Sequence, residues 1–514
     1  MSNGKTLIRG ALILMLTGFL SRIIGFFYRI FLSRAIGAEG MGIYQLIFPL
    51  YSLCFALTVA GLQTVLSRFI AGKLALGQDK AARDGLAVGV FLSLSLSLAA
   101  GGLMFYFARP ISLYFLQEPR CVSLLQLLSF CVPFGTVHAC LSAWYYARKK
   151  TALPSVCQLL EQLARVGASI LVYSILLERG LPVTPMVAVV GILAGECASA
   201  LTSMIAVSLD FQKASYSLRR LEHPVGYSRE LLLPALPLTA NRLLLTLLQS
   251  LESVLIPGRL LLFGLSSSAA LSVYGVLTGM ALPLILFPSA ITNAVSVMLL
   301  PTVAEEQAKG NRRTIAHTIE NTIKYCLILG IFATGVFLFF GREAGLLLFG
   351  NEQAGAFIQT LAFICPFLYL TTTLSSILNG LGKTTFCFAQ NLAGLIIRIL
   401  FVLFLVPRYG MPGYLWGLLA SELTITFLSF FLLHRIVPFT FSSWNWIIKP
   451  LLALAISGGV ALAVCQLGAL LPSFPPLLLL AFALLAMVCL YLYLLCGLEL
   501  IHIPMKRHTV LDKK

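Results

Sequence analysis

The stretch TGFLSRIIGFFYR, residues 17–29, lies inside an apolar run from Leu7 to Ser33 that is long enough to cross a bilayer. It carries two arginines, Arg22 and Arg29. At helical spacing both fall on one stripe of small and polar residues, and the other faces carry leucine, isoleucine and phenylalanine. The stripe consists of Gly18, Arg22, Gly25, Arg29 and Ser33. We therefore expect a membrane-spanning helix with one small, cationic face.

Arg22 is the deeper of the two charges. It lies roughly 20 Å along the helix axis from Arg9, at about 1.5 Å per residue, so its side chain does not easily reach the interface. An arginine at the bilayer centre costs at least ~2.5–3.5 kcal/mol. We favour the interpretation that Arg22 lines a site for an anion. The alternative is a structural charge paired with a carboxylate such as Glu252, or with carbonyls at a helix end.

The composition is that of a polytopic membrane protein. Of 514 residues, 59% are hydrophobic and 11% are charged, and the mean hydropathy is +0.94, whereas soluble proteins carry about 25% charged residues. The net charge of +17 is better explained by cytoplasmic loops than by binding to nucleic acid. The twelve cysteines are scattered singly through apolar runs and are typical of core residues. We expect no metal, no cofactor and a monomer.

Fourteen candidate spans follow one another, and no loop is long enough for a soluble domain. They cover residues 7–33, 43–70, 86–107, 124–147, 154–177, 183–209, 231–256, 271–300, 319–340, 356–378, 386–406, 413–433, 447–467 and 474–495. The expected fold is therefore an all-α membrane protein of fourteen transmembrane helices.

The distribution of lysine and arginine predicts the orientation. The termini and every second loop hold 23 of the 36 cations, and the remaining loops hold 7. Because cytoplasmic loops carry the excess of positive charge, both termini are expected in the cytoplasm of a bacterial cell. The other six cations lie within spans: Arg22, Arg29, Arg165, Arg242, Lys324 and Arg398. Lys324 is expected to reach the cytoplasmic face.

The chain contains an internal repeat of six spans. A shift of 233 residues places Pro133 on Pro366 and Arg165 on Arg398, and a shift of 220 places Arg22 on Arg242. An even number of spans gives both copies the same orientation, as in parallel-repeat transporters. We expect a first lobe over residues 1–209, a cytoplasmic linker over 210–230, a second lobe over 231–438, and two further helices with a tail over 439–514.

Polar residues of both copies are candidates for a shared central cavity. In the second copy of the opening helix, Arg242 and Gln249 repeat the spacing of Arg22 and Arg29. Arg165 and Arg398 form a second related pair. Since Glu161 precedes Arg165 by four residues, Arg165 could instead be neutralised by Glu161 within its own helix. Arg398 has no such carboxylate on its helix.

Three carboxylates and two prolines complete the candidate site. Glu252 flanks the polar stripe of the second copy, and Glu196 and Glu422 are repeated in spans six and twelve. They are either helix-packing groups, which we favour for the repeated pair, or sites for a coupling proton or sodium ion. Pro283 and Pro288 are expected to kink or break span eight, as a hinge or as a packing feature.

The sequence lacks the motifs that would indicate nucleotide binding or catalysis. The run Gly382-Lys383-Thr384 is preceded by isoleucine where a phosphate-binding loop needs glycine, and no strand precedes it. No constellation of catalytic groups is visible in a loop. We therefore expect a protein that is not an enzyme.

Several motifs in the chain are similar to those of a known family. The segment Ser21-Arg22-Ile23-Ile24-Gly25, the run IGAEGMGIYQ at 36–45 and the run LNGLGK at 378–383 resemble the stage V sporulation protein B group. This group belongs to the polysaccharide-flippase branch of the multidrug/oligosaccharidyl-lipid/polysaccharide exporter superfamily. The resemblance covers essentially the whole chain, and the order of the motifs within the fourteen spans makes it specific.

The resemblance implies transport of polyprenyl-diphosphate-linked sugars, such as lipid II, from the inner to the outer leaflet. It further implies that Arg22 and Arg29 line the cavity and that the last two helices form a groove for the lipid tail. Guanidinium groups suit phosphate oxygens, which agrees with an anionic cargo. Alternatives are a cation-coupled multidrug antiporter of the same superfamily and a non-transporting scaffold for cell-wall synthesis.

Overall fold

A computed structural model of the chain describes residues 2–214, 216, 221, 223–469 and 475–500. The expected tail from 501, and Arg219 and Arg220 of the expected linker, lie outside the described residues. Helices are the regular elements of the described residues, which contain no strand. All twelve cysteines are free thiols, most of them buried in the core as expected.

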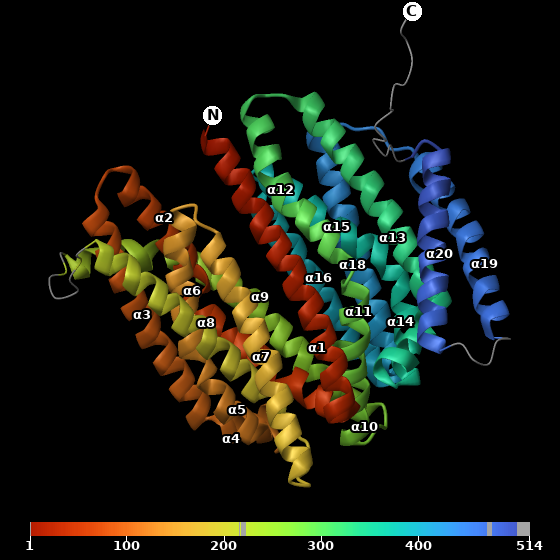
Figure 1. Cartoon of the computed structure of the whole chain (residues 1–514), viewed down its shortest axis with the longest axis horizontal. Helices are drawn as coiled ribbons and strands as arrows, with labels where there is room; N and C mark the ends of the chain where they lie inside the picture. The colour runs from red at the N-terminus through yellow and green to blue at the C-terminus, as the bar shows by residue number, and fades with distance from the viewer. Residues whose placement is uncertain (1, 215, 217–220, 222, 470–474, 501–514) are drawn as a thin grey trace, which may run out of the picture.

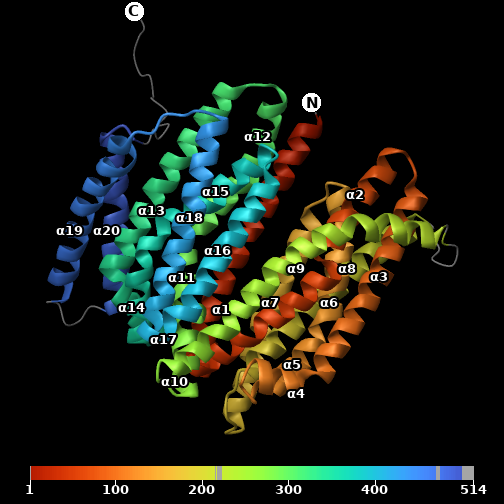
Figure 2. The same cartoon turned by 180° about the vertical axis from the view of Figure 1, so that it is seen from behind.

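The first half of the chain forms one lobe (Figures 1 and 2). Its elements are α1 (Ser2–Phe55), η1 (Ala56–Ala60), α2 (Gly61–Ala75), α3 (Asp79–Tyr106), α4 (Ala108–Pro110), η2 (Ile111–Phe115), α5 (Cys121–Ser129), α6 (Cys131–Ala147), α7 (Ala152–Glu178) and α8 (Met186–Lys213). The long helix α9 (Pro224–Leu262) follows. It begins beside α2 and α3 of this lobe and ends beside α16 and α17 of the other.

The second lobe repeats this arrangement. It comprises α10 (Ser267–Gly275), η3 (Val276–Ala281), α11 (Leu282–Leu286), α12 (Ser289–Ala308), α13 (Arg312–Phe349), α14 (Glu352–Leu361), η4 (Ala362–Ile364), α15 (Cys365–Gly380), α16 (Thr384–Phe404), α17 (Val406–Tyr409) and α18 (Met411–Ile436). Then η5 (Trp444–Ile448), α19 (Lys449–Ala469) and α20 (Pro476–Gly497) pack at its outer edge against α13.

Thirteen helices of the described chain are long and apolar enough to cross a membrane. The first, Met15–Ala75, has 61 residues and covers most of the first predicted span and all of the second. The helix bends at Gly37, where φ is 71°, a left-handed value that favours glycine. At about 1.5 Å per residue a helix of this length is far longer than one bilayer crossing. The number of fourteen crossings stays a prediction.

The internal repeat appears as equivalent packing in the two lobes. A Cβ atom added at Gly101 of α3 would lie 2.9 Å from the carbonyl oxygen of Ser129, beside Pro133. One added at Gly330 of α13 would lie 2.4 Å from Cα of Pro366. In each lobe, therefore, a glycine lets the third spanning helix approach the helix that carries the repeated proline.

Candidate functional site

The prolines break span eight, as predicted. In place of one helix there are α10, a π-helical turn η3, the short α11 and then α12. Pro283 lies in the first turn of α11, and Pro288 directly precedes α12. Irregular helical turns of this kind leave carbonyl groups without their usual donors. Whether the break acts as a hinge stays a prediction.

The broken helix and α1 border an open cavity of about 610 Å³. Arg22, Gly25 and Arg29 line it from the first limb of α1, and Pro283 and Asn293 line it from the other lobe. The remaining lining residues are Phe26, Gln45, Phe48, Thr278, Leu282, Leu286, Phe287 and Ser289. Among the described residues none of these is a carboxylate. The cavity is therefore a cationic space between the two lobes.

The two arginines of this cavity keep most of their hydrogen-bonding capacity. Arg29 is half-buried, and its Nη1 donates to the carbonyl oxygen of Thr278 at 3.5 Å, a long contact. Arg22 is exposed, and within the described residues it has no hydrogen bond or ion pair. Asn293 donates to the carbonyl oxygen of Ser289 at 2.8 Å and adds a polar group to the opposite wall. Such a space can accept an anion with several oxygen atoms.

Glu252, the carboxylate named as a possible partner of Arg22, pairs with a different arginine. Its Oε2 lies 3.2 Å from Nη2 of Arg398, and its Oε1 accepts a hydrogen bond from Tyr414 at 3.0 Å. This cluster is buried within the second lobe. Sequence reasoning missed the pair because Glu252 belongs to α9 and Arg398 to α16.

The related cluster of the first lobe is also internal. Arg165 Nη2 lies 2.5 Å from Glu161 Oε1, which is the i, i+4 pair that the sequence left open. Glu196 is buried and accepts a hydrogen bond from Tyr51 at 2.8 Å. Glu422 is half-buried on α18. These contacts favour a structural role for Arg165 and Arg398 over contact with a cargo.

Arg242 and Gln249 are not brought to the arginine-lined cavity. Both are exposed on α9, and neither lines the space that contains Arg22. Thr246, on the same face, is buried and bonds to the carbonyl oxygen of Arg242 at 2.9 Å. A role for Arg242 and Gln249 stays a prediction.

An apolar groove of about 640 Å³ lies on the neighbouring face of α12. Val295 and Leu299 of α12, Phe332 of α13 and Leu492 of α20 are among its lining residues. Helix α12 thus contributes to both spaces, since Asn293 faces the cationic cavity. The combination places an apolar surface next to the arginine-lined cavity.

The lobes touch closely where α1 bends, at the lower end of the molecule in Figure 1. A Cβ atom at Gly42 would lie 2.0 Å from the carbonyl oxygen of Leu271, and one at Gly275 would lie 2.2 Å from that of Ala38. Nearby, Arg34 donates to the carbonyl oxygens of Leu348 (2.9 Å) and Leu347 (2.5 Å) at the end of α13. We call this contact between α1 and the second lobe the bend contact.

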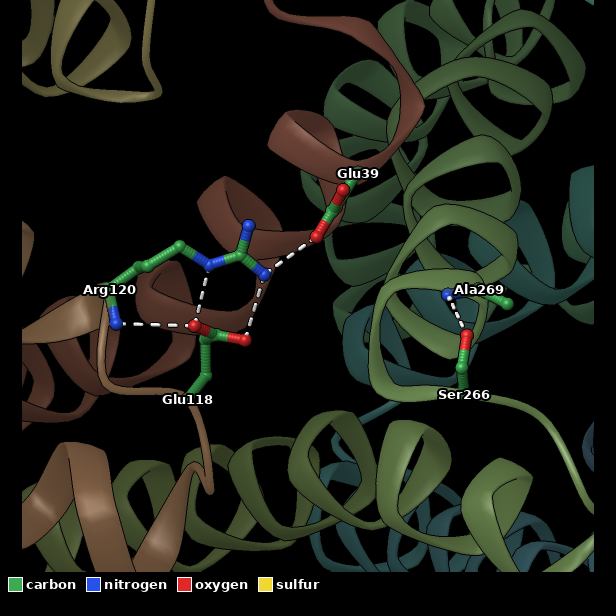
Figure 3. A network of polar contacts seen from close by, with 5 residues as sticks. All are labelled: Glu39, Glu118, Arg120, Ser266 and Ala269. Atoms are coloured by element: carbon green, nitrogen blue, oxygen red, sulfur yellow. Dashed lines mark hydrogen bonds and ion pairs between the residues drawn. The ribbon is translucent and has the colours of Figure 1, made fainter.

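An ionic network stands beside the bend contact (Figure 3). Arg120 donates from Nε to Glu118 Oε1 at 2.7 Å and from Nη2 to Glu39 Oε1 at 2.7 Å. The guanidinium of Arg120 holds the pKa of the Glu118 carboxyl below its usual value, and the Glu118 carboxylate in turn raises the pKa of Arg120. In the second lobe Ser266 caps α10 by accepting the N–H of Ala269 at 3.3 Å.

The chain is similar to known proteins in sequence and in fold. A family model described as polysaccharide biosynthesis protein matches residues 7–307, and a model described as MatE matches residues 244–404. The chain is 25% identical to stage V sporulation protein B of Bacillus subtilis (strain 168) over 440 residues, which are 84% of this chain and 85% of that protein.

The chain is also similar to a flippase, both in sequence and in structure. The chain is 22% identical over 488 residues to Lipid II flippase MurJ of Bacillus subtilis (strain 168), with 90% of this chain and 88% of that protein covered. A solved structure of Lipid II flippase MurJ in an inward closed conformation has a TM-score of 0.70 at 13% identity. It covers 95% of this chain and 99% of that chain, and this likeness shows the two-lobed fold.

Proposed function

The chain belongs to the polysaccharide biosynthesis protein family, and from this premise we propose that it moves a polyprenyl-diphosphate-linked saccharide from the inner to the outer leaflet. It is a multi-pass membrane protein with the fold of flippases and exporters, and its relatives are transport proteins, not enzymes. Rocking of the two lobes around the cavity would give alternating access.

The observation that carries the proposal is the composition of the cavity between the lobes. Arg22 and Arg29 supply two positive charges, and no carboxylate lines this space among the described residues. A diphosphate loses hydration on entering a bilayer-embedded site, and guanidinium groups replace that hydration with charge-assisted hydrogen bonds. The apolar groove on the neighbouring face of α12 would accommodate part of the polyprenyl chain.

Transport in reconstituted liposomes tests the proposal. Proteoliposomes that contain a fluorescent polyprenyl-diphosphate disaccharide are treated with an impermeant quencher, and the rate of exchange between leaflets is measured. Arg22→Gln is expected to lower this rate about tenfold or more, because a hydrogen bond to a charged group contributes ~1.5–3 kcal/mol. Arg179→Gln, an exposed arginine at the C-terminal end of α7, is the matched control. Unchanged exchange by the Arg22 variant would contradict the proposed site.

A cation-coupled multidrug antiporter is the second candidate, because the MatE model matches residues 244–404. Buried Glu196 and half-buried Glu422 are the groups that could carry a coupling proton or sodium ion. Efflux of cationic dyes that is abolished by Glu196→Gln, with no exchange of the diphosphate lipid, would favour this candidate. Exchange of the diphosphate lipid without dye efflux would exclude it.

A further inference from the structure

A second cationic cavity lies at the opposite end of the molecule from the bend contact. It has a volume of about 670 Å³ and lies between α2 and the first turns of α9, two segments that pack against each other. Arg68 and Lys73 of α2 line it, together with Glu230 of α9. It shares no lining residue with the cavity that contains Arg22.

The two cations of this cavity are only partly compensated. Lys73 Nζ lies 3.6 Å from Glu230 Oε2, and the Glu230 side chain is 54% exposed. Within the described residues Arg68 is exposed and has no hydrogen bond or ion pair. Two positive charges and one negative charge leave the cavity with a net charge of +1. Exposed ion pairs contribute little, so an anion with several oxygen atoms can compete with Glu230 for Lys73.

The rest of the wall is apolar. Val65, Pro234 and Leu238 line the cavity, and Leu76 at its rim is 72% exposed. Two of the prolines that lie within α9, Pro234 and Pro237, are part of this wall. Below the cavity the two helices close: a Cβ atom at Gly61 would lie 2.8 Å from the carbonyl oxygen of Ala235. The space therefore opens away from Gly61, with cations at its mouth and an apolar surface beneath them.

We propose that this cavity binds the phosphate of an anionic glycerophospholipid of the leaflet that the end of α2 faces. Arg68 and Lys73 would contact the phosphate oxygens, and the upper acyl chain would lie along Val65 and Leu238. A lipid accounts for both properties of the cavity, the cations and the exposed apolar rim, whereas a free phosphate would use only the first. Basic pockets between spanning helices are known to take anionic lipid head groups.

The site has a structural consequence. Helix α2 belongs to the first repeat, and α9 begins the second. A bound lipid would add contacts on both helices and so stabilise the side-by-side packing of α2 on α9. Since a ligand stabilises only the state that it binds, anionic lipid is expected to favour the lobe arrangement described here.

Thermal unfolding of the purified full chain in a neutral detergent tests the proposal. Phosphatidylglycerol is expected to raise the melting temperature by several degrees at saturation, and phosphatidylcholine at the same concentration is expected to leave it unchanged. In the double variant R68Q/K73Q the effect of phosphatidylglycerol should be lost. In the control K149Q/K150Q, which alters exposed lysines of the α6–α7 turn, the effect should persist.

Two further arms make the test decisive. Glu230→Gln removes the competing carboxylate and is expected to lower severalfold the phosphatidylglycerol concentration that gives half of the maximal shift. This variant tests the site even if R68Q/K73Q fails to fold. Inorganic phosphate is added alone. A full shift by inorganic phosphate would indicate a site for a free anion and overturn the lipid assignment, as would an equal phosphatidylglycerol shift in R68Q/K73Q.

Discussion

At the scale of single residues, the guanidinium group of Arg22 matters for geometry as well as for charge. Arginine offers a planar fork to phosphate oxygens, whereas lysine offers a compact point charge. In the exchange assay Arg22→Lys is therefore expected to retain an intermediate rate, above that of Arg22→Gln and several-fold below that of the unaltered chain. Equal rates for the lysine variant and the unaltered chain would show that charge alone is required.

The ionic network beside the bend contact predicts a dependence of stability on pH. The pKa of Glu118 is lowered below 4.5, chiefly by its hydrogen bond with Arg120. A carboxyl with a lowered folded-state pKa stabilises the fold fully above its unfolded-state pKa, and this contribution is lost as the pH falls through the folded-state value. Arg120→Gln should therefore lower the melting temperature at pH 7, and this loss should become smaller as the pH falls below 4.5.

The exposed pair of Arg342 with Glu352 provides the control for this experiment. Its side chains are 62% and 65% exposed, and surface pairs of this kind contribute about 0–1 kcal/mol. Arg342→Gln is expected to change the melting temperature little at either pH. A loss of stability in Arg120→Gln that is the same at pH 7 and pH 3 would contradict the assigned role of Glu118.

At the scale of elements, the bend contact depends on glycine. Because a Cβ atom at Gly42 would lie 2.0 Å from the carbonyl oxygen of Leu271, Gly42→Ala must displace α10 from α1. Overpacking of this kind costs about 1–3 kcal/mol, which should appear as a lower melting temperature. Gly18→Ala is the control: nothing lies within 4 Å of the added atom, and alanine is expected to be neutral or stabilising in a helix.

The groove between α12, α13 and α20 predicts a selective effect on cargo. Val295 lines this groove and is 44% exposed, so Val295→Trp fills part of the space without burying a charge. Exchange of a long-chain polyprenyl substrate should fall several-fold, while a substrate with a much shorter chain should be affected less. Val225→Trp, an exposed position on α9 outside the groove, is the control, and equal losses for both substrates would contradict a role in holding the chain.

The periodicity of the sequence predicted most of the helices and the residues that share a helix face, because both depend on residues close together in the chain. Two arginines seven residues apart must share a helix face, and Arg22 and Arg29 do line one cavity. Pairing across the fold has no such local signal. Arg398 meets Glu252 only because α16 packs on α9, and Arg34 reaches the carbonyl oxygens of α13 across 314 positions of chain. Asn293 is a polar residue in an apolar run after Pro288, and this pattern could have predicted that it lines the cavity.

At the scale of the whole molecule, the two-lobed fold confirms the architecture expected from the internal repeat. The repeat was readable because the shift between copies is constant within spans and changes only at loops. The position of α9 between the two lobes could not be predicted from the sequence. Its first turns pack on the first lobe and its last turns on the second. The division of the chain at residue 231 stays a prediction.

The orientation of the molecule in the membrane is the prediction that belongs to this scale. Helix α7 runs from Ala152 to Glu178, so the preceding turn and the following loop must lie at opposite ends of it, roughly 40 Å apart at 1.5 Å per residue. The excess of lysine and arginine in one set of loops predicts that Lys149 faces the cytoplasm and Arg179 the outside. Lys383 precedes α16 and Arg408 follows it, so they lie in the turn and the loop that correspond to those around α7.

Single cysteines at these exposed positions are expected to react with an impermeant maleimide in a strict pattern on intact cells. Arg179→Cys and Arg408→Cys should be labelled at once, and Lys149→Cys and Lys383→Cys only after the membrane is permeabilised. The unaltered chain, whose cysteines are mostly buried, gives the background. The reverse pattern would invert the direction of transport proposed for the cationic cavity. A mixed pattern, in which 149 and 383 lie on different sides, would mean that the two repeats are not parallel, and no rocking of equivalent lobes could then give alternating access.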